Sequence, residues 1–440
     1  MSLTCARPRH PLNTLRPLHP SHPLHPLLTA TALLTLFASP ILIRAAGPAD
    51  FRGIGALPGS RNGSIAYAIS DDGSAVTGIS DQSDLGGPST VAFLWQADTM
   101  ISLGDLPGGS TVSEAGGVSA NGSAAAGMSA SSNGTEAFRW EAGVMVGLGD
   151  VPGGDVYSHA FRISGDGTTV VGLSRSANGD AAFRWQAGAM RNLADDFPGG
   201  LAAGWATDAS FDGSVVVGYL ATTSGPPRPM RWENNVATLI DIAPADVWGQ
   251  ATAVSPDGQS IAGTITHQLS PLVREAFFWR DGTLTLLGDL PGGATRSSAA
   301  DVSGDGSIVV GTGRTSLGDE AFIWTAARGL RRVRDLLEQD YGLNLAGWQL
   351  TAANGISADG LTIAGSGVNP LGQPEAWLAH IGCALAGDMN NDARCDGGDV
   401  EGFVRCLTTG LGCGCGDFDA DQTVGPADVA PFVDRLLGRA

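Results

Sequence analysis

The sequence Val118-Ser119-Ala120-Asn121-Gly122-Ser123, followed by Gly127 and then by Glu136-Ala137-Phe138-Arg139-Trp140, contains the pattern that decides the fold. Its element Ser-x-(Asp/Asn)-Gly occurs seven times, at the turn glycines Gly73, Gly122, Gly167, Gly213, Gly258, Gly306 and Gly360. A second glycine stands five residues after each of them, at Gly78, Gly127, Gly172, Gly218, Gly263, Gly311 and Gly365. A tryptophan follows in every copy (Trp95, Trp140, Trp185, Trp232, Trp279, Trp324, Trp377), and neighbouring ones are 45 to 53 residues apart. This period is typical of a supersecondary unit repeated in an array.

Each repeat contains the residues of four short strands, as the copy from Val118 to Gly154 illustrates. Asn121-Gly122 favours a tight hairpin between the first two strands. Phe138 and Trp140 share one face of the third strand because side chains alternate along a strand. Pro152-Gly153 favours a type II turn after the fourth strand. Four strands per repeat are the content of one propeller blade, so we predict an all-β, seven-bladed β-propeller of four-stranded blades over residues 51–381.

The two ends of the array predict that the last sheet is completed by the first strand. The seventh repeat supplies three strands up to Leu378 and no fourth, whereas residues 51–58 read as a fourth strand and turn with no repeat before them. Pairing these segments leaves no open sheet edge. Residues 330–347 are an insertion before the seventh repeat, and residues 331–338 within it are expected to be helical.

These repeats resemble the HAF-type repeats of secreted bacterial proteins. The resemblance lies in Glu-Ala-Phe-x-Trp at 136–140 and 320–324, in Leu-Gly-Asp-Leu-Pro-Gly-Gly at 103–109 and 287–293, and in residues 347–360. It implies a propeller-like fold and little chemistry.

Composition limits the partners of the chain. The 440 residues carry a formal net charge of −19, which disfavours nucleic acid and anionic membrane surfaces. The acidic surface favours cations and cationic partners, or serves solubility alone. Residues 1–46 combine a basic start, an apolar run from Leu27 to Ile43 and Arg44-Ala45-Ala46-Gly47, so we expect a signal peptide and a secreted or cell-surface protein. A retained membrane anchor is the alternative, although the run is short and interrupted by Pro40.

Five of the six cysteines lie near the C-terminus: Cys383, Cys395, Cys406, Cys413 and Cys415. In an exported protein this crowding predicts disulfides within a small C-terminal module. Because the number is odd, one thiol is left over or pairs elsewhere, and the connectivity stays open.

The same region repeats a spacing of oxygen-bearing residues. The first loop offers Asp388, Asn390, Asp392, the carbonyl of Arg394, Asp396 and Asp399, and the second, 29 residues later, offers Asp417, Asp419, Asp421, Thr423 and Asp428. Calcium takes six to eight hard oxygen ligands, and this spacing wraps such ligands around one ion. Each loop is followed by an apolar helical periodicity, at Val400, Phe403, Val404 and Leu407 and again at Val429, Phe432, Val433 and Leu436. We therefore predict two Ca²⁺ ions bound by residues 388–440.

The duplicated loops look like a type I dockerin. The resemblance implies a small α-helical module with two EF-hand-type calcium loops, docking to a cohesin domain, and attachment within carbohydrate-degrading assemblies. Two departures stand out. Ala393 and Gln422 occupy a position that usually holds glycine, at a cost of about 1 kcal/mol each. Gly425 replaces a ligand in the second loop.

No residue in the repeats is predicted to be catalytic. The repeated serines Ser70, Ser119, Ser164, Ser210, Ser255, Ser303 and Ser357 are expected to accept bonds in their turns, since no histidine accompanies them. Trp205, Trp248 and Trp348 lie outside the tryptophan series and either pack in the core or stack on a sugar.

Two hypotheses about function follow. The first is a secreted, non-catalytic binding or display protein that binds a cohesin-like domain or cell-surface component, with the propeller presenting a face to a partner or glycan. The alternative is a component enzyme of a polysaccharide-degrading assembly, acting as a glycoside hydrolase.

Overall fold

The computed structural model describes residues 49–382 apart from 61–62, 82–89, 198–201, 223–224, 235, 244–245 and 268–272. Beyond these it describes residues 386–389, 395, 397–409, 415–418 and 424–439. Residues 42–440 form one compact unit. The other unit, residues 1–41, and the whole of the expected signal peptide, residues 1–46, lie outside the described residues.

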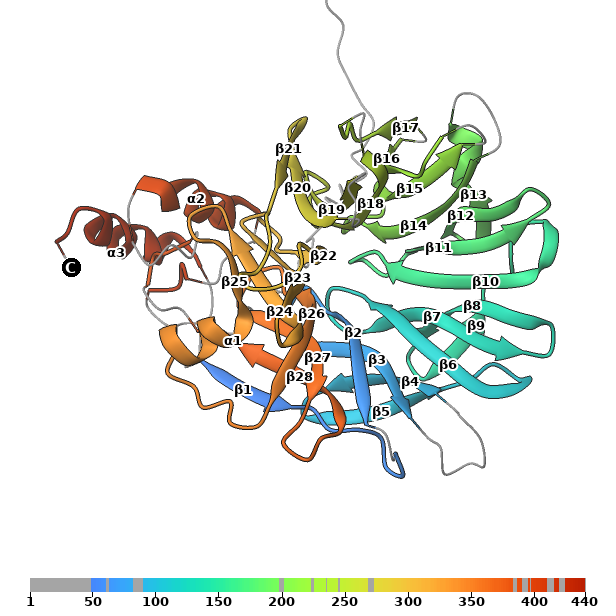
Figure 1. The fold of residues 1–440 in the computed structure, drawn as a ribbon, viewed down its shortest axis with the longest axis horizontal. Coiled ribbons are helices and arrows are strands. Elements are labelled where there is room, and N and C mark those ends of the chain that lie inside the picture. Colours follow the sequence, from blue (N-terminus) through green and yellow to red (C-terminus); the bar gives the residue numbers. More distant parts are fainter. Residues whose placement is uncertain are drawn as a thin grey trace, which may run out of the picture. The chain divides into compact units, whose positions relative to one another are not determined.

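The described part of the chain consists mainly of strands, which form six hydrogen-bonded sheets around a common centre (Figure 1). Five of the sheets have four strands each. The first contains β2 (Ser64–Ile69), β3 (Ala75–Asp81), β4 (Thr90–Gln96) and β5 (Thr99–Gly104). The second contains β14 (Ala202–Ala209), β15 (Val215–Thr222), β16 (Arg228–Glu233) and β17 (Val236–Leu239), and the third contains β18 (Asp246–Val254), β19 (Ser260–His267), β20 (Val273–Arg280) and β21 (Thr283–Leu286). The fourth contains β22 (Ser297–Val302), β23 (Ile308–Thr315), β24 (Gly318–Thr325) and β25 (Gly329–Arg332), and the fifth contains β26 (Gln349–Ile356), β27 (Thr362–Val368), β28 (Pro374–His380) and β1 (Asp50–Gly53). An eight-stranded sheet contains β6 (Gly108–Val118), β7 (Ala124–Ser131), β8 (Gly134–Glu141), β9 (Val144–Gly147), β10 (Gly153–Ile163), β11 (Thr169–Ser176), β12 (Gly179–Gln186) and β13 (Ala189–Asn192).

The all-β, propeller-like fold is confirmed, but the prediction of seven separate four-stranded blades is wrong. Five sheets stand as four-stranded blades, while β6 to β13 join in a single sheet. The joint is a parallel bridge between Tyr157 of β10 and Thr135 of β8. Tyr157 lies where the pairing of β10 with β11 shifts in register, between Gly153 and Ser158. The count of strands per repeat carries no information about such a joint.

The repeated turn is held by its serine. In all seven copies the serine Oγ donates a hydrogen bond to the side-chain Oδ1 of the Asp or Asn two residues later, at 2.5 to 3.2 Å. The same Oγ accepts the backbone N–H five residues later, at 2.9 to 3.0 Å. The expectation that these serines serve their turns is confirmed. The turn glycine needs its left-handed φ, which is 73° at Gly122.

The second glycine of each repeat is required by a close backbone approach. A Cβ at Gly127 would stand 1.7 Å from the carbonyl oxygen of Glu114 on the facing strand, and one at Gly172 would stand 2.0 Å from that of His159. The other five copies meet a facing carbonyl at 1.9 to 2.2 Å. No larger side chain fits there without moving the backbone.

The third strands supply the core between the sheets. Phe322 faces Gly311 and Trp324 faces Val309 across β23 and β24. The other complete repeats pair in the same way, except that Met230 takes the place of the phenylalanine opposite Gly218. In the last repeat Trp377 faces Gly365 and Ala379 faces Ile363. Trp377 therefore occupies the phenylalanine position of its repeat, not the tryptophan position, and it is fully buried.

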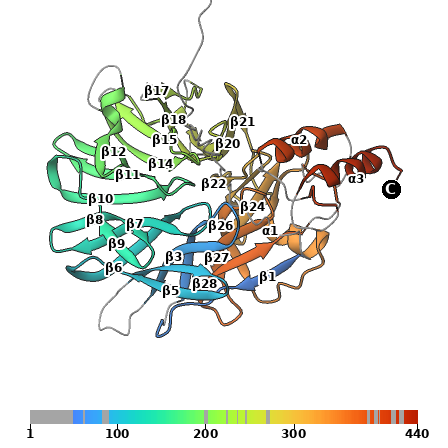
Figure 2. The same cartoon turned by 180° about the vertical axis from the view of Figure 1, so that it is seen from behind.

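The predicted pairing of the N-terminal segment with the last repeat is confirmed for β1. Phe51 pairs with Ala379 and Gly53 with Trp377 in antiparallel register, and Figures 1 and 2 both show β1 beside β28. The Phe51 ring lies 5.2 Å from that of Trp348 and 6.0 Å from that of Trp377, centroid to centroid. Trp348 is thus a packing residue.

Backbone bonds link the repeated turns to one another. The donor and acceptor pairs are Asp72 N to Ala120 O, Ala120 N to Gly165 O, Asp166 N to Phe211 O, Phe211 N to Pro256 O, Gly304 N to Ala358 O and Ala358 N to Asp71 O, all at 2.8 to 3.0 Å. The series runs from turn to turn and returns from the last repeat to the first. Its one gap follows Pro256, which has no N–H to donate.

Helices are few and short in the described residues. They are the 3₁₀ helices η2 (Leu193–Asp196) and η4 (Gly397–Asp399), α1 (Val333–Asp335) continuing as the π-helix η3 (Leu336–Asp340), α2 (Val400–Thr409) and α3 (Pro426–Leu436). The helix expected over 331–338 begins at Val333, since Arg331 and Arg332 end β25. None of these helices is long and apolar enough to cross a membrane.

The predicted EF-hand-type module is corrected as well. After residue 381 the described residues form two short helices and one 3₁₀ turn, and no EF-hand arrangement is found among them. Phe403 and Phe432 stack with ring centroids 3.9 Å apart, and they pack in one apolar cluster with Trp377 and Ile381. This segment therefore shares a core with the last sheet. Cys406 and Cys415 are disulfide-bonded, in line with the expected disulfides.

Candidate binding site at the centre of the sheets

Two cavities lie on the axis around which the sheets are arranged. The wide cavity, of about 420 Å³, is lined by residues of the first strand of every repeat: Tyr67, Glu114, Gly116, His159, Phe161, Arg162, Thr207, Thr252, Ala299, Ala300 and Asn354. The narrow cavity, of about 60 Å³, lies nearer the repeated turns and is lined by Asp71, Arg162, Asp208 and Asp301 among others. Arg162 lines both.

Several polar side chains of the wide cavity donate hydrogen bonds to the backbone of the neighbouring sheet. Thr207 Oγ1 donates to the carbonyl of Ala251 at 2.8 Å, and Thr252 Oγ1 to that of Ala299 at 2.9 Å. Asn354 Nδ2 donates to the carbonyl of Ala66 at 2.7 Å. These side chains connect first strands that share no sheet ladder, so their hydrogen-bonding capacity is used in the fold.

The charged residues of the narrow cavity do the same. Asp208 Oδ2 accepts the N–H of Val254 at 2.8 Å, and Asp301 Oδ2 accepts the N–H of Ile356 at 2.9 Å. Arg162 Nη1 donates to the carbonyls of Gly116 and, at 3.3 Å, Phe161.

Burial governs the protonation of the three aspartates. Desolvation raises the pKa of Asp71 to about 7, and the charges of Asp301 and Asp72 add to the rise. Desolvation also raises the pKa of Asp208 to about 7 against the opposing charge of Arg162. The pKa of Asp301 is raised by burial as well.

Three polar side chains of the wide cavity are not used in this way. Within the described residues, Tyr67, Glu114 and His159 form no side-chain hydrogen bond, although all three are partly buried. Burial raises the pKa of Glu114, and burial with the charge of Glu114 raises that of Tyr67 to about 12. Burial lowers the pKa of His159 to about 4, so its imidazole is neutral at pH 7. These groups are available to a ligand.

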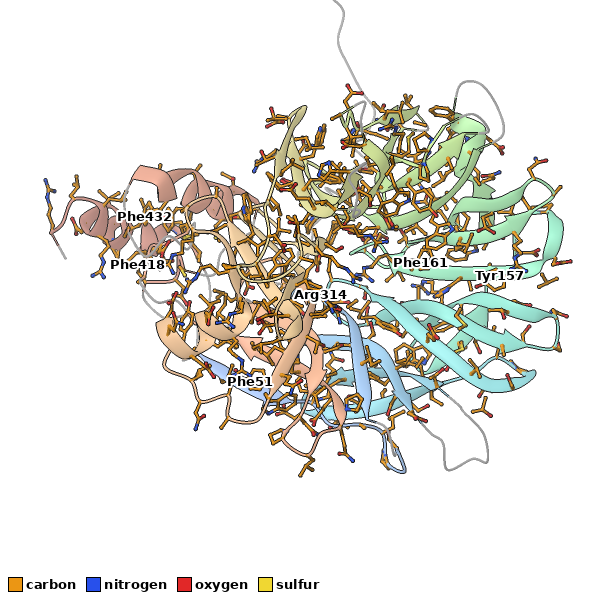
Figure 3. All side chains as sticks on the ribbon, viewed as in Figure 1. Phe51, Tyr157, Phe161, Arg314, Phe418 and Phe432 are labelled. Atoms are coloured by element: carbon orange, nitrogen blue, oxygen red, sulfur yellow. The ribbon has the colours of Figure 1, made fainter. Side chains whose placement is uncertain are left out.

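A row of aromatic rings leads away from the wide cavity. His159 and Phe161 have centroids 4.7 Å apart, Phe161 and Trp205 5.5 Å, Trp205 and Tyr219 5.5 Å, and Tyr219 and Trp248 6.2 Å. The rings are tilted against one another by 41° to 56° from Phe161 onward. Figure 3 shows Phe161 on β10, closer to the centre of the sheets than Tyr157. Trp205 and Trp248 thus contact a cavity-lining residue through this row.

A histidine cluster also lies outside the cavities. His267 Nδ1 is 2.6 Å from Asp246 Oδ1, and its Nε2 is 3.2 Å from Glu275 Oε2. The sequence does not reveal this cluster, because the three residues come from three strands. Both ring nitrogens face carboxylates, so the cluster holds β18, β19 and β20 together.

The structure places four of the eleven predicted calcium ligands. Asp399 Oδ1 accepts the N–H of Met389 at 2.7 Å, and Asp428 Oδ1 accepts the N–H of Phe418 at 2.6 Å, so the same bond recurs 29 residues apart. Asp388 and Asp417 are also described. The other seven (Asn390, Asp392, Arg394, Asp396, Asp419, Asp421 and Thr423) lie outside the described residues. Among the described residues no group of three or more metal-binding side chains converges.

Comparison with known proteins supports the fold alone. No family model and no curated protein matches the chain, so neither the HAF nor the dockerin resemblance gains support. The oligogalacturonate lyase of Vibrio parahaemolyticus is similar in structure, with a TM-score of 0.50 and 11% identity over 76% of this chain and 97% of that one. TolB of Acinetobacter baumannii gives a TM-score of 0.39 and 15% identity over 61% of this chain and 62% of TolB, which is less than two thirds of TolB's length.

Proposed function

We propose that this protein is a non-catalytic binding protein that takes a ligand into the wide cavity. The observation that carries the proposal is the contrast within the cavity wall. Thr207, Thr252 and Asn354 are engaged by neighbouring strands. Tyr67, Glu114 and His159 form no hydrogen bond to a described residue and surround a volume that suits a small ligand. All three are partly exposed, so their polar atoms can be reached from the cavity and can bind a ligand.

The absence of catalysis is part of the proposal. General acid–base catalysis needs groups whose pKa lies near the working pH. His159 is held neutral by a lowered pKa, and the two aspartates with pKa near 7 line the narrow cavity, where Asp208 is bound by backbone amides. Turnover of a glycan by the intact protein would favour the alternative, a polysaccharide-degrading enzyme.

The test is equilibrium binding of a panel of oligosaccharides to the intact protein, with product analysis of the same mixtures. Tyr67→Phe and His159→Ala should weaken binding at least about threefold, while Thr238→Ala on the outer strand β17 should not change it. Binding that is insensitive to both cavity variants would place the ligand elsewhere and overturn the proposal.

We further propose that the C-terminal segment binds two Ca²⁺ ions through the predicted residues and attaches the exported protein to a cohesin-type domain or cell-surface component. The described residues fit a hard cation: Asp388, Asp399 and Asp428 are only 3%, 0% and 1% exposed. Carboxylate oxygens are hard ligands of the kind that Ca²⁺ takes. Titration calorimetry of the intact protein with CaCl₂ tests this, and Asp399→Asn with Asp428→Asn should abolish the heat.

A further inference from the structure

We propose that the wide cavity and the aromatic row together bind an oligosaccharide of amino sugars, with one protonated amine on the Glu114 carboxylate. This inference rests on the proposed function, since it names the ligand of the same cavity. It follows from three features: the balance of charge in the wall, the aromatic rings, and the neutrality of His159.

Glu114 and Arg162 are the charged side chains among the residues that line the cavity. Arg162 is engaged by the carbonyls of Gly116 and Phe161, and it faces the carboxylates of Asp208 and Asp301. The Nη1 donor of Arg162 is thereby taken by main-chain carbonyls of the wall. Glu114 has no hydrogen bond to a described residue, so its carboxylate is left to attract a cation from the ligand.

Aromatic rings line the same cavity as this carboxylate. Tyr67 and Phe161 line the cavity, and Trp205 contacts Phe161. Aromatic faces attract ammonium groups and also stack on the apolar faces of sugar rings. An ammonium with hydroxyls around it, on a flat ring, satisfies both preferences at once.

The row of rings gives the ligand its length. Phe161, Trp205, Tyr219 and Trp248 lie on β10, β14, β15 and β18, each partly exposed, with successive centroids 5.5 to 6.2 Å apart. Such a row offers several successive platforms, so a chain of sugars gains contacts that a single sugar lacks.

His159 allows this arrangement because burial keeps its pKa at about 4. A protonated imidazole in the cavity would repel an ammonium, whereas the neutral ring exchanges hydrogen bonds with hydroxyls. The chain's net charge of −19 also attracts cationic ligands. Acidic sugars meet an unpaired carboxylate and are excluded.

The experiment measures the Kd of the intact protein at pH 6 for glucosamine oligosaccharides, N-acetylglucosamine oligosaccharides, cello-oligosaccharides, oligogalacturonates and spermidine. We expect the glucosamine oligomers to bind at least about tenfold more tightly than each of the others. Glu114→Gln should remove that preference, and Trp205→Ala should weaken longer oligomers more than the monomer. Glu141→Gln, the same change at an exposed site on β8, should have no effect.

The outcomes separate this inference from the proposed function. Equal binding of neutral oligosaccharides, lost in Tyr67→Phe but unchanged in Glu114→Gln, would overturn the amino-sugar inference and leave the cavity as the binding site. Equal binding of spermidine would show an amine site without sugar recognition, and would also overturn it. If no panel member binds, both proposals fail. Melting curves of each variant exclude loss of the fold.

Discussion

Single residues in this chain have roles that the repeat assigns and the structure explains. The serine of each turn makes the same two bonds in seven copies, so its identity follows from local geometry. The glycine five residues later follows from contact across the hairpin, where the facing carbonyl leaves no space for a Cβ. In the sequence the serine and the second glycine recur with equal regularity. Only the structure shows that the serine is required by the turn and the glycine by packing.

Gly127→Ala tests the packing requirement. The new Cβ would stand 1.7 Å from the carbonyl oxygen of Glu114, and backbone on both sides must shift. We expect a loss of about 3 kcal/mol in the free energy of unfolding, measured by denaturant titration. Gly397→Ala is the control, because no atom lies within 4 Å of its Cβ. Equal stability of both variants would contradict the assigned role.

Asp71→Asn tests the protonation of the narrow cavity. Burial raises the pKa of this carboxyl from 3.8 to about 7, so the folded protein holds the proton more tightly than the unfolded chain. The stability that this proton gives is complete below about pH 4 and is lost as the pH rises through 7. The variant should be more stable than the natural protein at pH 8 by about 1 kcal/mol, after allowance for water access, and equal to it near pH 4. Urea titrations at pH 4, 6 and 8 measure this, and a constant difference across pH would contradict it.

At the scale of elements, the sequence predicts the strands of each repeat and the pairing of the first strand with the last. Turn residues and alternation are local, and the missing fourth strand is visible as an incomplete copy. The joint between Tyr157 and Thr135 could not be predicted, since it lies at a register shift in the pairing of β10 with β11 that the repeat pattern does not show. Glu114 and His159 stand eight residues before their turn glycines, and Tyr67 stands six residues before its own. The cavity wall was missed because the residue type at these positions changes from copy to copy, and the shared wall appears only when the first strands converge.

Removal of residues 1–62 tests the pairing of β1. Without this segment β28 loses its antiparallel partner, and the Phe51 ring no longer covers Trp348 and Trp377. An exposed edge favours aggregation, so we expect loss of soluble protein or a large fall in the melting temperature. Phe51→Ala, which keeps the strand, should cost about 2 kcal/mol because the ring is partly exposed. A shortened chain that melts like the full one would contradict the role of β1.

At the scale of the whole molecule, the C-terminal segment shares an apolar core with the last sheet. Removal of a metal from this segment should therefore affect the last sheet as well. Phe403, Phe432 and Met389 belong to the same apolar cluster as Leu337, Ile381 and Trp377. Figure 3 shows Phe418 and Phe432 close together, and their ring centroids are 6.1 Å apart. A segment with a separate core would melt alone, whereas one with a shared core affects its neighbours.

If the proposed calcium is bound, chelation with EDTA should raise amide hydrogen exchange in residues 386–439, because metal binding that favours the folded segment is lost. Exchange should also rise in β26, β27 and β28, which share that core, and stay unchanged in β14 to β17, which pack in another cluster. The measurement needs reduced protein beside oxidised protein, because the disulfides of Cys406 and Cys415 can hold the segment without metal. The double variant Asp399→Asn with Asp428→Asn should show the raised exchange with or without EDTA.

Two results would contradict these expectations. If EDTA leaves the exchange of the reduced protein unchanged, the calcium proposal is wrong. If the exchange rises only in residues 386–439, the shared core is wrong.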